Sequence, residues 1–368
     1  MAYISIFLIS TTLACCSEQL YRKNKRELGA IVAIIMVVSI SIFAGARSTS
    51  VGTDTEYYLV NHFNWAQGYK NQFPEFLKYM YKYEEVDVLY IVLVYICSIG
   101  FGNVHVLMFA LSLITNTFMY LALIQKREQI SVSTGWFIYC FILYNTTLNI
   151  MRQSCAIAIL TYSIVAYDQK KISNRKLIVL GIIATLLHRS APLAMLIILM
   201  LYLFNNNRKY KYLLILLTSL ICAFPLFFEF LKFVISRLNF LPIRYMTYFV
   251  DDNAVQSGVL LDTIMYMLPT VGLIICRLKC KKREMAKYIS MGLICVAASL
   301  RSNMLMNRLN YYFIVFFSIS IPLSIRVMTK KREGRLIYGG MILFCIVFLW
   351  IINIVMYNYG QTCPYTID

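Results

Sequence analysis

Long apolar runs recur from one end of the sequence to the other, and short basic clusters separate them. A run of about 20 apolar residues crosses a bilayer as a helix, and the hydrocarbon interior admits only helices and closed barrels as spanning elements. The pattern therefore predicts an all-α polytopic membrane protein. We expect residues 1–368 to form a single integral membrane domain, because the longest polar stretch is short and rich in aromatic residues.

Basic clusters set the expected topology. Cytoplasmic loops of membrane proteins carry an excess of Lys and Arg, so each cluster is assigned to the cytoplasmic side. The chain must leave and return between consecutive clusters, which predicts about twelve spans with both termini outside. The clusters lie at residues 22–26, 126–127, 170–176, 208–211, 277–283 and 330–335.

One interval holds three apolar runs, 28–46, 87–101 and 104–124, although an even number of crossings allows only two. The run 87–101 is short for a span, at about 15 residues. We therefore interpret it as an interfacial or re-entrant helix on the outer side. Residues 47–86 and 234–258 are expected to form an outer loop and an outer segment that cover the bundle.

Composition agrees with this interpretation. Hydrophobic residues make up 60% of the chain and charged residues 14%, whereas a soluble domain carries about 25% charged residues. The net charge of +18 could suggest nucleic acid, but the Lys-rich clusters fall between the spans, so no nucleic-acid partner is predicted. The 11 cysteines lie mostly inside apolar runs without metal-ligand spacing, and neither a metal nor a cofactor is predicted.

Arginines collect near the outer ends of the predicted helices, where the topology rule would deplete them. A single arginine there is an ordinary interfacial anchor, but anchoring does not select Arg over the scarcer Lys. A guanidinium grips phosphate oxygens with a planar fork of donors, so the group suits an anionic lipid head group, above all a diphosphate. The polar residues expected on this face include Arg47, Asp54, Arg152, Gln153, His188, Arg189, Arg237, Arg244, Arg301 and Arg308.

Helical spacing groups some of these side chains. Arg301, Arg308 and Tyr312 share one face if their helix is continuous, and so do the asparagines at 145 and 149 with Arg152. Polar faces of spans usually point into the bundle or into a watered cavity. Hydrogen bonding between helices is the alternative interpretation of the asparagine face.

Two residues are candidates for acid–base chemistry. His188 follows a predicted helix and stands beside Arg189, whose positive charge favours the neutral imidazole that accepts a proton. Asp54 is the other candidate. For each, a structural role is the alternative: a hydrogen bond at a helix end for His188 and an ion pair with Arg47 for Asp54.

Four stretches of the chain, in this order, resemble the EpsG family of multi-pass bacterial membrane proteins, which belong to exopolysaccharide and capsule clusters and are akin to Wzy-type and O-antigen polymerases. They are "RSTSVGTDTEYY" (47–58), "LNIMRQSCAIAI" (148–159), "ATLLHRSAPLAM" (184–195) and "NRLNYYF" (307–313). The resemblance implies glycan polymerisation on the extracytoplasmic face of the bacterial cytoplasmic membrane, and a GT-C-like helical bundle is the expected fold. The family motif positions are then Arg47, Gly52, Asp54, Tyr58, Arg152, Gln153, His188 and Arg308.

We therefore expect a metal-independent membrane glycosyltransferase that acts on polyprenyl-diphosphate-linked oligosaccharide among membrane lipids, with other polysaccharide export proteins as candidate partners. His188 or Asp54 is the expected catalytic base. The expected substrate-binding residues are Arg47, Tyr58, Arg152, Gln153, Arg244, Arg301, Arg308 and Tyr312. A flippase of lipid-linked oligosaccharide, an outer-face polysaccharide acyltransferase and a transferase that adds a single sugar are the alternatives.

Overall fold

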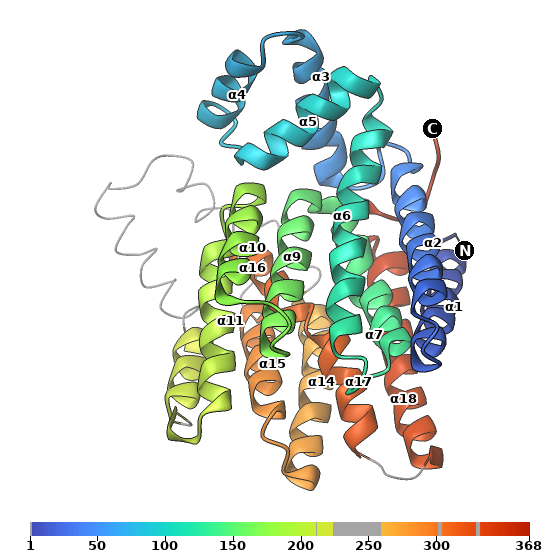
Figure 1. Ribbon diagram of the computed structural model, residues 1–368, viewed down its shortest axis with the longest axis vertical. Helices are drawn as coiled ribbons and strands as arrows, with labels where there is room; N and C mark the ends of the chain where they lie inside the picture. The colour runs from blue at the N-terminus through green and yellow to red at the C-terminus, as the bar shows by residue number, and fades with distance from the viewer. Residues whose placement is uncertain (1, 211, 224–258, 301–303, 329–331) are drawn as a thin grey trace. The chain divides into compact units, whose positions relative to one another are not determined.

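The computed structural model describes residues 2–210, 212–223, 259–300, 304–328 and 332–368 (Figure 1). Over these residues the chain is helical, and no strand occurs among them, which confirms the all-α class. The predicted outer segment 234–258, with Arg244 in it, and the predicted site residue Arg301 lie outside the described residues.

The chain forms two compact units. Unit 1 comprises residues 1–195 and 350–368, and unit 2 comprises residues 196–349. The helix α11 (Ala191–Asn206) belongs partly to each.

Five helices form the main packing of unit 1: α1 and α2 form a hairpin, α6 packs against α2 and α9, and α10 packs against α9. The remaining segments lie between and around them. The elements of unit 1 are α1 (Ala2–Arg22), α2 (Arg26–Gly45), η1 (Thr55–Leu59), α3 (Val60–Gly68), α4 (Phe73–Lys82), α5 (Val88–Phe101), α6 (Val104–Gln125), α7 (Val132–Tyr139), η2 (Cys140–Tyr144), α8 (Asn145–Asn149), α9 (Met151–Asp168), α10 (Asn174–Leu187), η4 (Ile351–Met356) and η5 (Tyr359–Gln361).

Unit 2 is built around α14, which packs against α15 and α17. The pair α14–α15 approaches closely because residue 292 is glycine: a Cβ there would meet the hydroxyl of Thr270 at 2.2 Å. The elements of unit 2 are η3 (Arg208–Tyr210), the helix Tyr212–Ala223, α14 (Val259–Cys280), α15 (Met285–Ser299), α16 (Met304–Ile314), α17 (Phe317–Met328) and α18 (Arg332–Trp350), whose last residue, Trp350, belongs to unit 1.

Six helices of the described part are long and apolar enough to cross a membrane, and four shorter apolar helices accompany them. The six are Ala2–Arg22, Arg26–Gly45, Val104–Gln125, Leu260–Cys280, Asn307–Met328 and Glu333–Met356; the shorter ones are Val88–Phe101, Ala191–Asn205, Tyr212–Ala223 and Met285–Ser299. These helices make the chain a multi-pass membrane protein. The count of about twelve spans stays a prediction.

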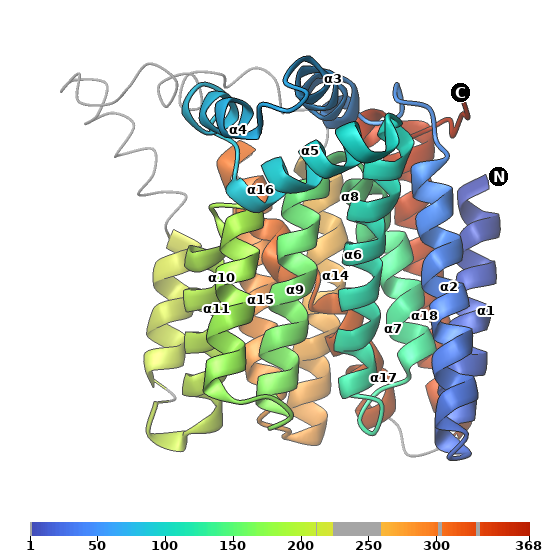
Figure 2. The ribbon, with the colours of Figure 1, turned by 45° about the horizontal axis from the view of Figure 1, so that its top comes forward.

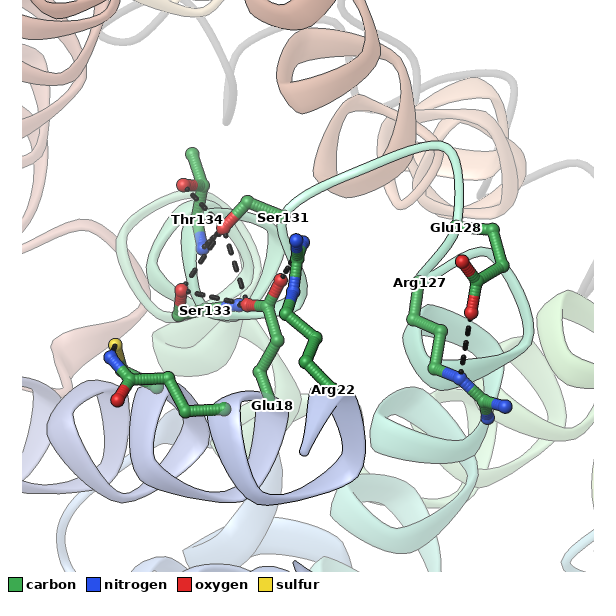
Figure 3. Close-up of polar contacts among 9 residues, drawn as sticks. Glu18, Arg22, Arg127, Glu128, Ser131, Ser133 and Thr134 are labelled. Atoms are coloured by element: carbon green, nitrogen blue, oxygen red, sulfur yellow. Dashed lines mark hydrogen bonds and ion pairs between the residues drawn. The ribbon is translucent and has the colours of Figure 1, made fainter. Parts of the chain in front are cut away.

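The basic turns of unit 1 meet at one end of its helices. Lys126, after α6, forms a 3.0 Å ion pair with Asp168 at the end of α9. Near the basic turn between α1 and α2, Glu18 extends from α1 towards the first turn of α7 (Figure 3). Its carboxylate accepts hydrogen bonds from the backbone N–H and the hydroxyl of Ser133, both at 3.0 Å, and from Arg22 at 2.8 Å. Polar contacts therefore fix the helix ends that carry the basic clusters.

The opposite end of unit 1 carries the segment between α2 and α6. Here α5 runs across the ends of α6 and α10 instead of parallel to them (Figure 2). It is 14 residues long and is followed by Gly102, whose φ of +63° suits glycine. Asn103 then caps α6, because its side chain accepts a 2.9 Å hydrogen bond from the backbone N–H of His105. The residues "GFGN" thus turn the chain from a transverse helix into a bundle helix.

Candidate functional site

The loop after α2 is held from inside by Arg47. Its side chain is fully buried, and its guanidinium donates to the carbonyl oxygens of Ala44, Val51 and Leu148 and to the hydroxyl of Thr55. The distances are 2.8 Å to Leu148 and 3.0 Å to Thr55. Burial lowers the pKa of Arg47 to about 10, so the group is still charged near neutral pH. Arg47 thus ties the loop to the end of α8, and its donors are directed to protein oxygens.

A second residue holds the same loop to the C-terminal segment. The side-chain oxygen of Asn149 accepts from the backbone N–H of Asp54 at 3.2 Å, and its amide donates to the carbonyl of Gly360 at 2.8 Å. Gly52 lies against the same side chain with φ of +98°, a conformation that L side chains rarely adopt. The motif "VGTD" is therefore shaped by its contact with the "NTTLN" stretch of α8.

The polar face predicted across residues 145–152 is interrupted in the structure. Ile150 has non-helical backbone angles, so α8 ends at Asn149 and α9 begins at Met151. The asparagine Asn145 contacts Trp350 and Thr362 at 2.9 and 3.1 Å. The break sends the asparagines towards the C-terminal segment and Arg152 towards α5, because the helical register is not maintained across it.

Arg152 and Arg189 converge on Asp87, and we call these three residues the arginine cluster. One oxygen of Asp87 lies 3.9 Å from a nitrogen of Arg152, and the other lies 3.7 Å from a nitrogen of Arg189. The three residues come from the start of α9, the turn before α11 and the start of α5, respectively. Three segments that are far apart in the sequence therefore meet at one acidic group.

The electrostatics of the arginine cluster are set by partial burial. Burial raises the pKa of Asp87, while the charges of Arg152 and Arg189 and a hydrogen bond from the backbone of Arg189 act in the opposite direction. The side chain of Arg152 is 27% exposed, and that of Arg189 is 52% exposed. Both guanidiniums, each with five N–H donors, are thus accessible from outside while a shared carboxylate holds them.

Tyr90 contacts the arginine cluster directly, and His62 contacts Tyr90. The guanidinium of Arg152 lies over the ring of Tyr90, 5.1 Å from its centroid, and the hydroxyl of Tyr90 is 3.3 Å from Nδ1 of His62. Burial, with a smaller effect from the charge of Arg152, lowers the pKa of His62 to about 3. His62 is therefore a neutral imidazole across the physiological pH range.

The other predicted site residues of unit 1 occupy varied positions. His188 is half-buried between α10 and α11, and its Nδ1 is 2.7 Å from the hydroxyl of Ser190. Asp54 is half-buried at the start of η1, Tyr58 is 52% exposed, and Gln153 is buried in α9. His188 is next to one member of the arginine cluster in the chain, because Arg189 follows it directly.

Two predicted site residues belong to unit 2. Arg308 and Tyr312 lie on α16, four positions apart, which places them on one helical face. Arg308 is half-buried and Tyr312 is buried.

Sequence reasoning missed three residues of this site: Asp87, His62 and Tyr90. Asp87 directly precedes a run of apolar residues, and a lone carboxylate at such a position is usually interpreted as the start of a helix. One signal could have pointed to Asp87: Arg152 and Arg189 lie on two other outer segments, and two such positive charges require a negative partner. Within the described ranges, no three His, Cys, Asp or Glu side chains gather as a metal site would require.

Fold and site together define a polytopic helical membrane protein whose arginines meet at the end of unit 1 opposite its basic turns. The chain belongs to the EpsG family, which it matches over residues 30–367, nearly its whole length. EpsG is a family of Wzy-like polymerases. Comparison with curated proteins and with solved structures gave no match.

Proposed function

We propose that this protein is a polysaccharide polymerase of the bacterial cytoplasmic membrane. It transfers the glycan from one polyprenyl-diphosphate-linked oligosaccharide to a sugar hydroxyl of a second lipid-linked repeat unit, on the extracytoplasmic face. Membership of the EpsG family supports the reaction class. The observation that carries the proposal is the arginine cluster, because the leaving group of this reaction is an anionic lipid diphosphate.

The chemistry needs stabilisation of negative charge. The bond between the anomeric carbon and the diphosphate oxygen breaks, the acceptor oxygen forms the new glycosidic bond, and the acceptor proton passes to a base. Arg152 and Arg189 would bind the diphosphate as its charge develops, and donors already held in place are worth more than mobile ones. Asp87 would act as a positioning residue that keeps the two guanidiniums together.

For the base we retain the two residues that the sequence suggests. His188 stands next to Arg189 in the chain, with its Nδ1 close to a hydroxyl, an arrangement that orients an imidazole for proton transfer. Asp54 follows Gly52 in the loop that Arg47 and Asn149 fix. Since the guanidinium of Arg47 is buried against carbonyl oxygens, we assign it to this loop and not to the diphosphate.

The finer architecture belongs to the same proposal. We propose about twelve spans in a GT-C-like bundle, with α5 lying at the outer membrane surface. Arg308 and Tyr312 of unit 2, together with Arg244 and Arg301, remain candidates for further contacts with lipid-linked substrate. Other polysaccharide export proteins are the proposed protein partners.

The test uses purified full-length protein and the lipid-linked repeat unit of its own polysaccharide. Arg152→Lys and Arg189→Lys retain charge but lose the bidentate fork, and each should lower the rate of chain formation by about tenfold or more. Arg127→Lys is the matched control. Arg127 is 32% exposed, pairs with Glu128 at 3.2 Å and lies over the ring of Tyr21 at 5.7 Å, at the opposite end of unit 1.

Full activity of both cluster variants would exclude the cluster as the diphosphate site. The products separate the alternatives: glycan ladders indicate a polymerase, and a product one sugar longer indicates a single-sugar transferase. Movement of intact lipid-linked oligosaccharide across vesicles without new glycosidic bonds would indicate a flippase, and an acylated glycan would indicate an acyltransferase.

A further inference from the structure

A continuous path of rings crosses the surface formed by η1, α3 and α4. Neighbouring ring centroids are 6.4 Å apart for Tyr58 and His62, 5.6 Å for His62 and Trp65, 5.8 Å for Trp65 and Tyr79, and 5.6 Å for Tyr79 and Tyr83. We call these five residues the aromatic row. Each step lies within the range in which aromatic rings contact one another.

The two ends of the aromatic row face outward. Tyr58 is 52% exposed and Tyr83 is 54% exposed, while Trp65 and Tyr79 between them are half-buried. His62 alone is buried, and it is the residue that contacts Tyr90 of α5. The row therefore offers ring surface at Tyr58, Trp65, Tyr79 and Tyr83, and the buried ring of His62 joins the first two of these from within.

The helices that carry the row are polar on their exposed sides. Beside Trp65 on α3, the side chains of Asn61, Asn64 and Gln67 are exposed. On α4, Lys78 and Lys82 are exposed. The two helices have 9 and 10 residues and are not among the helices able to cross a membrane. Amides and ammonium groups next to rings indicate a surface that faces water and not lipid tails.

This combination fits a carbohydrate. The C–H face of a sugar ring is apolar and packs on an aromatic ring, whose large rigid surface loses little entropy on binding. The hydroxyl groups at the sugar's rim need donors and acceptors, and a planar side-chain amide supplies both. A protein or peptide ligand would need paired backbone groups or a deep apolar anchor, and neither helix presents a strand edge.

The row also leads to the arginine cluster. Its buried member, His62, is 3.3 Å from the hydroxyl of Tyr90, and Tyr90 lies beneath the guanidinium of Arg152. A glycan whose diphosphate end is held at Arg152 and Arg189 would thus have a line of rings beside it.

We propose that the aromatic row is a binding surface for the polysaccharide chain, several sugars away from the reacting end. Its connection with catalysis rests on the proposed function, whereas the binding itself is measured without catalysis.

Tryptophan fluorescence provides the test. The chain has three tryptophans, and Trp136 and Trp350 are buried, at 0% and 3% exposure. Trp65 is the half-buried one within the row. Detergent-purified protein is titrated with lipid-free fragments of the organism's own polysaccharide, from one to several repeat units. We expect a saturable fluorescence change that strengthens with fragment length and disappears in Trp65→Phe.

Variants at the exposed ends sharpen the measurement. Tyr58→Ala and Tyr83→Ala should each weaken fragment binding by about fivefold, with unchanged thermal stability because both side chains are exposed. Tyr81→Ala is the matched control: Tyr81 is 63% exposed on α4 but stands outside the row, so its replacement should leave binding unchanged.

Different outcomes separate this inference from the proposed function. Fragment binding by a protein that forms no polymer would support the row while contradicting the polymerase. Polymer formation without any response of Trp65 to fragments would overturn the row. Quenching of Trp65 by brominated lipid in nanodiscs would also overturn it, because the row would then be part of an interfacial aromatic belt.

Discussion

The side-chain amide of Asn149 donates a 2.8 Å hydrogen bond to the carbonyl of Gly360, a residue 211 positions later in the chain. The same asparagine accepts from the backbone of Asp54. One side chain at the end of α8 thus joins the outer loop after α2 to the C-terminal segment. This contact fixes a predicted base, Asp54, relative to the break from which Arg152 emerges.

The first prediction concerns the glycines packed on Asn149. A Cβ at Gly52 would lie 2.8 Å from the Asn149 oxygen, and one at Gly360 would lie 2.6 Å from its nitrogen. Both glycines also have positive φ, which costs other residues about 1–2 kcal/mol. We expect Gly52→Ala and Gly360→Ala to lower the Tm in detergent by several degrees. Gly100→Ala, where no atom lies within 4 Å, is the control, and equal Tm values for all three variants would contradict the close packing of Gly52 and Gly360 on Asn149.

The second prediction distinguishes the structural role of Arg47 from the substrate-binding role proposed for Arg152. Lysine at position 47 would lose hydrogen bonds that the guanidinium donates to buried carbonyl oxygens, and a buried group left without its partner costs about 1–3 kcal/mol. Arg47→Lys should therefore reduce folded yield and Tm, whereas Arg152→Lys, at a part-exposed site, should reduce polymer formation with little change in Tm. Thermal unfolding and chain formation are measured on the same preparations. A stable but inactive Arg47→Lys protein would return Arg47 to the list of substrate contacts.

The third prediction is a pH dependence of stability. The pKa of His62 is lowered from 6.5 to about 3 in the folded protein, so the folded state binds fewer protons than the unfolded state between these values. The contribution of His62 is fully present above pH 6.5 and is lost as the pH falls, by about 1.4 kcal/mol per pH unit. We expect the Tm to fall between pH 6.5 and 4.5.

His62→Gln serves as the comparison, because glutamine keeps a polar partner for Tyr90 but does not titrate. Its Tm should change less over the same pH interval. Parallel Tm curves for both proteins would show that other groups control the acid sensitivity. Asp87 acts in the opposite direction, since its raised pKa makes the folded state bind its proton more readily.

The fourth prediction tests Asp87 as a positioning residue. Without its charge, Arg152 and Arg189 lose their common partner and repel each other. Asp87→Asn should reduce polymer formation by about tenfold or more, mainly through weaker binding of lipid-linked donor. Because the pKa of Asp87 is raised, acid pH should neutralise it before ordinary carboxylates and should reduce wild-type activity more than that of the variant.

Glu85→Gln is the matched control for Asp87. Glu85 is 47% exposed and forms an ion pair with Arg189 at 3.3 Å. Ion pairs at this exposure are worth about 0–1 kcal/mol, so activity should be nearly unchanged. Equal losses in both variants would indicate that net charge, and not the position of Asp87, matters.

Local patterns predicted the helical class and the separation of basic turns from arginine-bearing turns. The ion pair of Lys126 with Asp168 and the contacts of Glu18 with the start of α7 both lie at basic turns. The run after Asp87 was also predicted to differ from the spans, because its length is visible in the sequence. Each of these properties depends on residues that are close together in the chain.

The sequence did not predict the roles of individual outer residues. Arg47 and Arg152 look alike in the sequence, yet Arg47 is buried against carbonyl oxygens and Arg152 is part-exposed beside Asp87. The predicted continuous polar face from Asn145 to Arg152 is interrupted at Ile150. Residues at helical spacing share one face only if the helix between them is continuous, and the single non-helical residue Ile150 interrupts it.

The sequence by itself determined the helical membrane class and the family, since apolar runs and motif order are both written along the chain; the diphosphate chemistry of the arginine residues stays a prediction. Only the tertiary structure decided which arginine meets which carboxylate, and that the ring of Tyr90 lies under Arg152 and contacts His62. The physical reason is that these contacts join segments such as α5 and α9, whose approach depends on packing over many residues and leaves no local pattern.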